Sequence, residues 1–194
     1  YLDASGNPLP ADAAAGEIAF SQYDIQIQPG ILYQPHPAFA TDTSGNAHYL
    51  DLTAADLADI HTLADFRETG TRELVAADYV YQIKRLAHPR LHSPILGLMG
   101  DYIAGLQEYS QTLADAWDET AGEREDGVYL DLTRYPLAGA EVLDRYTYRI
   151  TIQGKYPQLL YWLAMPFFAP VPQEADRFYS QAGMQQRNIT LDWY

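Results

Sequence analysis

The sequence of 194 residues contains no cysteine and only two lysines, Lys84 and Lys155. Without cysteine the chain has no disulfides, no thiolate catalysis and no cysteine-ligated metal site. Its 12 basic residues stand against 26 acidic ones, which gives a net charge of −14. We therefore expect no nucleic-acid partner and no anionic membrane surface, because both are bound by clustered Lys and Arg. No run of 18 apolar residues occurs, so we predict no segment that spans a membrane.

Motifs for nucleophiles, phosphates and metals are also missing. The patterns G-x-S-x-G, G-x-G-x-x-G and G-x-x-x-x-G-K-[ST] do not occur. His88 and His92 are four residues apart, but Pro89 between them argues against a shared helix face. His61 and Asp65 have helical spacing, yet two ligands do not complete a site. We predict no metal and no cofactor.

Carboxylates allow one catalytic hypothesis, a hydrolase that uses residues such as Asp78 or Asp144. Each has a simpler local explanation, Asp78 at a helix N-terminus and Asp144 in a turn before a strand. The acidic stretch 118–127, with its run Glu123, Glu125 and Asp126, is typical of a solvated loop. We assign no catalytic residue, and the ligand-binding residues stay unknown.

Hydrophobic residues make up 47% of the chain, which indicates a folded globular protein. Tyr23, Ile25 and Ile27 alternate with polar residues, the pattern of a half-buried strand. The turn pair Pro29-Gly30 follows, and 31–33 reads as a returning strand, so we predict a hairpin over 18–33. Further strands are predicted over 128–132 and 146–152.

Apolar residues at helical spacing predict helices over 53–66, 76–87, 94–117, 157–164 and 173–181. Thr53 with Asp56 has capping-box spacing, and Ser93-Pro94 is a typical helix start. Strands and helices that follow in blocks favour an α+β fold, a small antiparallel sheet packed with several helices in a single domain over 1–194.

Aromatic residues cluster between positions 156 and 168: Tyr156, Tyr161, Trp162, Phe167 and Phe168. Packing in the core is the favoured interpretation, because buried aromatics mainly supply apolar area. The alternative is a self-contained interaction module that holds a partner on an exposed aromatic face.

Three ordered segments resemble a known family. Residues 73–89, ELVAADYVYQIKRLAHP, resemble the pattern T-A-x-D-[FV]-x-[YF]-[ST]-[IL]-x-R-x-x-x-P. Residues 142–150, VLDRYTYRI, resemble V-x-D-x-x-T-[LY]-x-[IF], and 23–33 resemble a strand followed by Pro-Gly. The helix over 156–164 and Pro170-Val171-Pro172 also fit. These patterns typify the extracytoplasmic peptide-binding proteins of ABC transporters, the oligopeptide, dipeptide and nickel group.

The chain also departs from the family pattern. Val75 stands where the family has a Thr that caps the helix, and Asp78 at the third helical position is expected to compensate. Residues 41–72 read as an insertion where relatives have a short loop.

The resemblance implies a three-domain, two-lobed protein that closes on a peptide or similar small solute and delivers it to an ABC permease in the inner membrane. The chain would be the peripheral domain of the first lobe, mainly a scaffold, and not an enzyme. Its last residues, 188–194, alternate and finish on two aromatics, so we expect a piece excised from a longer protein. That protein would be periplasmic or otherwise extracytoplasmic, either free or lipid-anchored.

Overall fold

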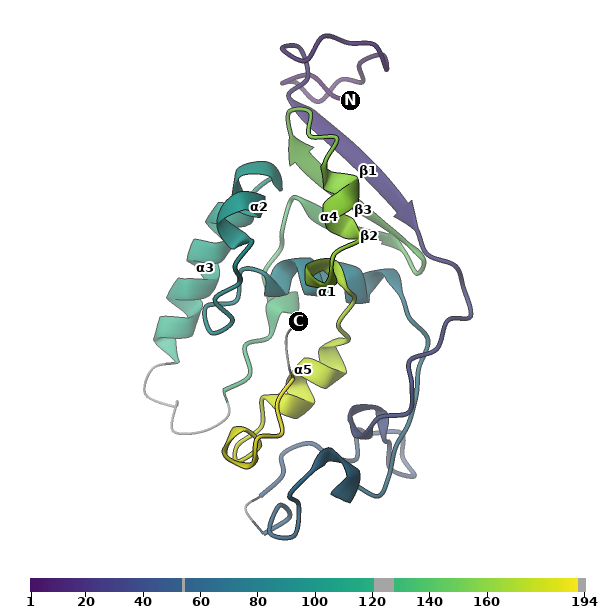
Figure 1. Cartoon of the computed structure of the whole chain (residues 1–194), viewed down its shortest axis with the longest axis vertical. Coiled ribbons are helices and arrows are strands. Elements are labelled where there is room, and N and C mark those ends of the chain that lie inside the picture. Colours follow the sequence, from purple (N-terminus) through teal and green to yellow (C-terminus); the bar gives the residue numbers. More distant parts are fainter. Residues whose placement is uncertain (54, 121–127, 192–194) are drawn as a thin grey trace. The chain divides into compact units, whose positions relative to one another are not determined.

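The computed structural model describes residues 1–53, 55–120 and 128–191, and the chain divides into two compact units (Figure 1). The first unit comprises Tyr1–Gln28, Val75–Trp117 and Leu132–Pro170, and the second comprises Pro29–Leu74, Asp118–Asp131 and Val171–Tyr194. The predicted α+β class is confirmed. The acidic run at 123–126 and the final aromatics lie outside the described residues.

The sheet of the first unit has three antiparallel strands in the order β1-β3-β2. They are β1 (Phe20–Gln26), β2 (Ala140–Asp144) and β3 (Thr147–Gln153). In the central strand β3, Tyr148, Ile150 and Ile152 are buried and alternate with less buried neighbours. The strand predicted over 146–152 is therefore confirmed, and its period of two places one row of side chains in the core.

The predicted hairpin over 18–33 is wrong. Strand β1 pairs with β3, with Tyr23 opposite Ile150, instead of turning back on 31–33. In the second unit Leu32 forms an isolated antiparallel bridge with Glu73. The Glu73 side chain also accepts a hydrogen bond from the Gly30 N–H at 2.6 Å. A Pro-Gly turn thus redirects the chain here without returning it to the preceding strand.

Helix α1 (Ala76–Arg85) confirms the predicted helix over 76–87 and packs on β2 and β3. Asp78 supplies the cap that Val75 cannot, because its Oδ2 accepts a hydrogen bond from the Val75 N–H at 3.0 Å. The N–H of Ala76 donates to the carbonyl of Arg145 at 2.9 Å. The first turn of the helix is thereby tied to the turn between β2 and β3.

The long helix predicted over 94–117 is two helices, α2 (Leu96–Tyr102) and α3 (Leu106–Glu119). At the break Ile103 is extended, and Gly105 has a φ of +75° that suits glycine. The N–H of Ala104 donates to the Thr151 carbonyl at 3.0 Å. Residues 103–104 therefore pair with β3 beyond the end of β2. This pairing interrupts the predicted helix between α2 and α3.

The strand predicted over 128–132 is wrong. Residues 128–131 have no regular secondary structure, and Leu132 begins the short 3-10 helix η4 (Leu132–Arg134). The ammonium group of Lys84 donates to the Leu132 and Tyr135 carbonyls at 3.3 and 2.7 Å. The two C-terminal helices are confirmed in shorter form as α4 (Leu159–Leu163) and α5 (Gln173–Tyr179). The remaining 3-10 helices are η1 (Pro37–Phe39), η2 (Leu63–Asp65), η5 (Pro166–Phe168) and η6 (Gln185–Arg187).

The second unit has a compact core built around α5. Its buried members are Ala38, Leu57, Phe66, Ala175, Phe178, Met184 and Ile189. The rings of Phe66 and Phe178 meet edge to face at 5.1 Å between centroids. His36 caps η1, since its Nδ1 accepts a hydrogen bond from the Ala38 N–H at 3.0 Å, and its Nε2 lies 2.8 Å from the Tyr179 hydroxyl.

The helix predicted over 53–66 is wrong, although its predicted start is real. The Asp56 carboxylate accepts a hydrogen bond from the Thr53 N–H at 2.9 Å, and the Thr53 hydroxyl accepts one from the Asp56 N–H at 3.3 Å. A second carboxylate, Asp65, accepts hydrogen bonds from the N–H groups of His61 and Thr62 at 2.9 and 2.8 Å. In a continuous helix these two N–H groups would donate to backbone carbonyls four residues earlier. Because they donate to Asp65, the chain forms turns at this point.

We predict that Gly139→Ala destabilises the protein by about 1–3 kcal/mol, the usual range for overpacking. A Cβ at this position would lie 2.5 Å from both the Ala104 carbonyl oxygen and the Ile103 Cγ2. Urea unfolding measures the change. Gly97→Ala is the control, because a Cβ there meets nothing within 4 Å. Equal midpoints for Gly139→Ala and the unaltered chain would contradict the close approach.

We also predict that acid weakens the second unit through His36. Burial lowers the pKa of its ring below the ordinary value of 6.5, so the unfolded chain takes up a proton before the folded one. The contribution of neutral His36 to the free energy of unfolding is complete above the pKa of the unfolded state. It is lost as the pH falls from that pKa toward the lower pKa of the folded state. Urea unfolding between about pH 7 and pH 5 measures the loss. His36→Asn keeps a capping acceptor without titrating in this range, so an equally steep pH dependence in that variant would refute the prediction.

Candidate functional site

The two carboxylates considered for hydrolysis have local partners. Asp78 is 2% exposed and caps α1. Asp144 lies in the turn between β2 and β3, where its Oδ1 accepts a hydrogen bond from the Tyr146 N–H at 2.8 Å. That backbone hydrogen bond is the main reason that the pKa of Asp144 is lowered. Both contacts agree with the local roles that the sequence predicts for these residues.

The histidines are dispersed. His88 and His92 both follow the end of α1, and His92 has a positive φ of 44°. His61 and Asp65 share no helix, and the carboxylate of Asp65 binds the His61 backbone. Within residues 1–53, 55–120 and 128–191, no group of three or more His, Cys, Asp or Glu is placed to hold a metal ion.

The aromatic cluster at 156–168 is divided between core and surface. Phe168 is 3% exposed and Tyr161 is 79% exposed. Tyr156 stacks on Tyr102 with 3.8 Å between centroids, and its hydroxyl accepts a hydrogen bond from the Trp162 indole at 2.9 Å. Leu160 and Met165 are exposed beside Tyr161. The preference for core packing holds for part of the cluster only, and α4 presents an apolar surface.

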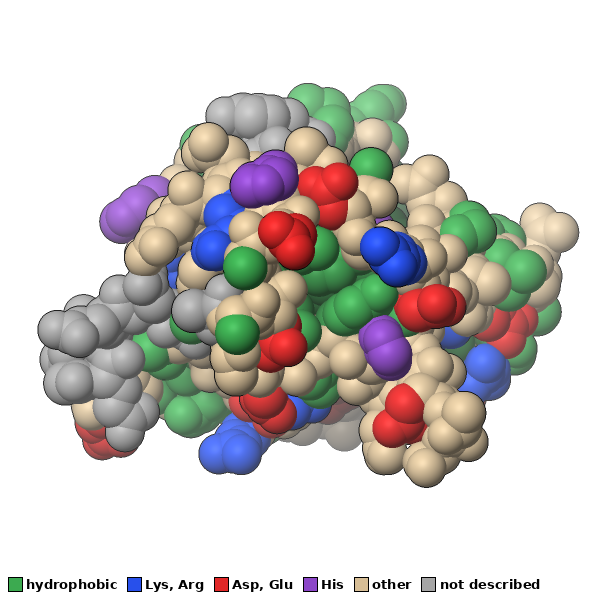
Figure 2. Space-filling view, turned by 90° about the horizontal axis from the view of Figure 1, so that it is seen from below, with side chains coloured by type: hydrophobic (Ala, Val, Ile, Leu, Met, Phe, Trp, Pro, Cys, Tyr) green, Lys and Arg blue, Asp and Glu red, His purple; other side chains and the backbone are tan. Residues whose placement is uncertain are grey.

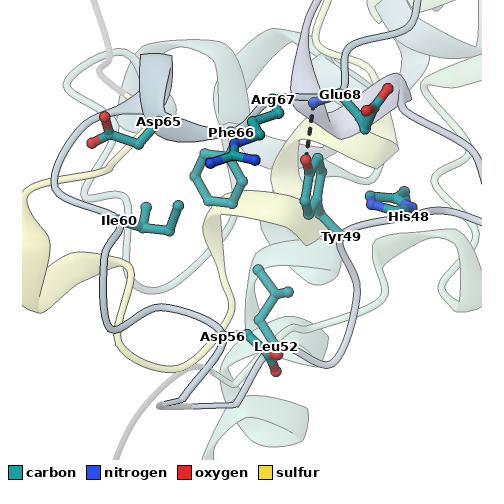
Figure 3. A pocket seen from close by; sticks show the side chains of 9 residues that line it. All are labelled: His48, Tyr49, Leu52, Asp56, Ile60, Asp65, Phe66, Arg67 and Glu68. Atoms are coloured by element: carbon teal, nitrogen blue, oxygen red, sulfur yellow. Dashed lines mark hydrogen bonds between the residues drawn. The ribbon is translucent and has the colours of Figure 1, made fainter.

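A hollow of about 410 Å³ lies in the second unit, and every residue that lines it belongs to the segment 41–72. We call it the aromatic hollow, and Figure 3 shows its nine side chains. They are His48, Tyr49, Leu52, Asp56, Ile60, Asp65, Phe66, Arg67 and Glu68. Pockets for small molecules usually have volumes of about 300–1,000 Å³. The segment read as an insertion is therefore the one that builds this hollow.

The apolar wall of the aromatic hollow is continuous with the core of the second unit. Phe66 is 5% exposed, and Tyr49, Leu52 and Ile60 pack as half-buried residues against the same core cluster. The Tyr49 and Phe66 rings meet edge to face at 4.9 Å between centroids, and His48 lies edge to face on Tyr49 at 4.5 Å. Figure 3 shows these apolar side chains around a common space.

Two hydrogen bonds fix Tyr49 in this wall. Its hydroxyl accepts a hydrogen bond from the Glu68 N–H at 3.0 Å, drawn as a dashed line in Figure 3. Its carbonyl accepts one from the Gln181 side chain at 3.0 Å, and the Leu52 N–H donates to the same side chain at 3.1 Å. The wall thus keeps its shape although the segment has almost no regular secondary structure.

The rim of the hollow is acidic. It carries the carboxylates of Asp56, Asp65 and Glu68 and one guanidinium, that of Arg67. Hydrogen bonds from Thr53 lower the pKa of Asp56, and those from the His61 and Thr62 backbone lower the pKa of Asp65. Both groups are fully exposed and ionised at neutral pH. Figure 2 shows a face on which hydrophobic side chains occupy a recess flanked by acidic, basic and His side chains.

Sequence reasoning missed the aromatic hollow because it predicted one helix across its lining. The signal that would reveal it is a repeated pattern, Thr53-Ala-Ala-Asp56 followed by Thr62-Leu-Ala-Asp65. Two Thr-x-x-Asp capping patterns nine residues apart indicate two separate starts of helical turns with a break between them. Leu57 and Ile60 lie in the intervening stretch, and Ile60 lines the hollow.

Comparison of the chain with protein-family models, curated proteins and solved structures finds no match. Among the described residues, no helix has the length and apolar character needed to cross a membrane.

We predict that Tyr49→Phe loosens the rim locally. The variant loses the oxygen that accepts the Glu68 N–H, and a hydrogen bond of this kind contributes about 0.5–1.5 kcal/mol. Hydrogen exchange at the Glu68 amide, followed by NMR, should accelerate by about two- to tenfold. Tyr161→Phe is the control, because Tyr161 is 79% exposed and belongs to the other unit. Unchanged exchange in Tyr49→Phe would show that the contact does not protect the amide.

Proposed function

We propose that this chain is part of the substrate-binding component of an ABC importer, which binds peptides or a similar solute outside the cytoplasm and delivers it to the permease. The family in this proposal comes from the sequence resemblance to the extracytoplasmic peptide-binding proteins of ABC transporters. The observation that carries the proposal is that the main parts of its motif segments, residues 23–28, 75–89 and 142–150, are far apart in sequence and belong to one folded unit. The support lies in the contacts between them.

The helix segment and the strand segment are joined at two points. The Ala76 N–H donates to the Arg145 carbonyl at 2.9 Å, and the rings of Tyr79 and Tyr148 stack with 5.1 Å between centroids and 9° between planes. Tyr23 of the third segment lies opposite Ile150 in the sheet. These contacts support the proposal because they place the three resembling segments beside one another in the first unit.

Helix α1 also contacts residues that follow the segment 156–164. The side chain of Gln82, in α1, donates to the Phe167 carbonyl at 2.7 Å. Polar groups of α1 thus bond to the protein's own backbone, as Asp78 and Lys84 also do. This usage supports a scaffold role for the unit, with the solute held by other parts of the full-length protein.

The mechanism in this proposal is closure of two lobes on the solute. A solute that binds the closed form more tightly than the open form shifts the population toward closure. Hinged closure of this kind is a common response of two-lobed binding proteins. In this mechanism the sheet and α1 of the first unit, which pack on one another, would move as one body.

A second candidate function is a self-contained protein-interaction module. The exposed apolar side chains on and after α4 favour it, with Leu160 at 58%, Tyr161 at 79% and Met165 at 45% exposure. Exposed aromatic residues are enriched at protein interfaces because they offer apolar area with a polar tip.

Fractionation of the source cells separates the two candidates. An antibody raised against this chain should detect, in the periplasmic or membrane-anchored fraction, a band several times heavier than 21.8 kDa. Disruption of the gene should then reduce uptake of labelled peptides, because the importer loses its binding component. Proteins of known compartment serve as fractionation controls. A band of 21.8 kDa in the cytosol would overturn the transport proposal and favour the interaction module.

A further inference from the structure

We propose that the aromatic hollow binds an amphipathic amine, a molecule with an apolar body of about one ring and a cationic ammonium group. The proposal goes beyond transport and does not rest on it. It stands on three features of the residues that line the hollow: their volume, their apolar wall and the sign of their charge.

The size and the wall select the body of the ligand. The hollow of about 410 Å³ is much larger than a single water site needs. Tyr49, Leu52, Ile60 and Phe66 line it with aromatic and branched aliphatic groups. An apolar ring placed there would gain from leaving water and from contact with the Tyr49 and Phe66 rings.

The rim selects the charged end. Three carboxylates against one guanidinium leave a net negative rim. An anion would be repelled, whereas an ammonium group could approach the carboxylates while its apolar body stays against the wall.

The rim is also set in place before any ligand arrives. One oxygen of Asp56 and one of Asp65 are engaged by backbone and hydroxyl donors of Thr53, His61 and Thr62. The other carboxylate oxygen of each accepts no hydrogen bond from the described residues. These oxygens are therefore fixed acceptors, so binding would cost little further ordering.

Calorimetric titration of this chain with three probes tests the proposal. Phenethylamine should bind with a dissociation constant of about 10 mM or lower, as expected for a small ligand. It should bind about tenfold more tightly than 3-phenylpropionate, which has a similar body and the opposite charge. Equal or weaker binding of phenethylamine, or no binding of it at all, would overturn the proposal.

A third probe identifies the source of the amine. Phenylalanyl-alanine amide carries the same ring and ammonium group at the start of a peptide. Tighter binding than phenethylamine would assign the hollow to peptide N-termini, and weaker binding would assign it to small free amines. Either result supports the shared chemistry, provided that the anionic probe binds less tightly.

Two variants tie the binding to the hollow. Glu68→Gln removes one rim charge without touching a capping bond and should weaken phenethylamine binding about two- to fivefold. Asp59→Asn is the matched control, because Asp59 is an exposed acid of the same segment that does not line the hollow. Leu52→Trp fills the space and should abolish binding. If Asp59→Asn weakens binding as much as Glu68→Gln, the rim is not the source of selectivity and the proposal fails.

Failure here and failure of the transport proposal are distinguishable. The titration measures this chain alone, whereas fractionation and peptide uptake measure the full-length protein in cells. A negative titration with a periplasmic band would refute the amine site and leave transport standing.

Discussion

The second unit depends on one buried ring, that of Phe178 in α5. Its side chain is 1% exposed, and the rings of His36, Phe66 and Tyr179 surround it at 5.1–5.6 Å between centroids. A long segment with almost no helix or strand loses as much backbone entropy on ordering as any other, about 1–2 kcal/mol per residue, with few ladder hydrogen bonds in return. Packing on Phe178 offsets part of that cost, and both η1 and the wall of the aromatic hollow contact this ring.

The hydrogen bonds of the second unit show the same dependence on side chains. Arg187 donates to the Leu57 carbonyl at 3.1 Å, and Arg72 forms a bidentate pair with Glu174 at 2.7 Å for each bond. Gln181 binds the backbone at Tyr49 and Leu52. Buried backbone groups need partners, and here polar side chains from the C-terminal part supply many of them. Segment 41–72 is therefore ordered by residues that lie more than 100 positions away.

Local chemistry is the part of the fold that the sequence predicts well. Asp78 caps α1 in place of the missing Thr, and the alternation of 146–152 becomes the central strand β3. Each of these signals needs only residues within a few positions. The capping pattern of Thr53 and Asp56 also forms, yet the helix after it does not, because the carboxylate of Asp65 takes the N–H groups that the helix needs. A cap predicts a start and says nothing of length.

Pairing between distant strands is the part that the sequence could not supply. Strand β1 could turn back through Pro29-Gly30 or pair with β3, and the local pattern is compatible with both. The outcome depends on β3, which lies between β1 and β2 and whose Ile150 and Ile152 are fully buried. The same strand also breaks the helix predicted over 94–117, because Ala104 bonds to Thr151. Periodicity within one segment carries no information about such a partner.

The aromatic hollow follows from this combination of local caps and distant packing. The carboxylates of Asp56 and Asp65 first serve folding, since each accepts hydrogen bonds from nearby N–H groups and its pKa is lowered by them. The contribution of these two ionised carboxylates to stability is present above the ordinary pKa of an aspartate. It is lost as the pH falls through their lower pKa in the folded state. The same bonds keep the rim negative and fix one carboxylate oxygen of each side chain. The same two carboxylates therefore stabilise the fold of the segment and give the hollow its charge. A substitution that neutralises Asp56 or Asp65 is expected to change both the stability and the charge.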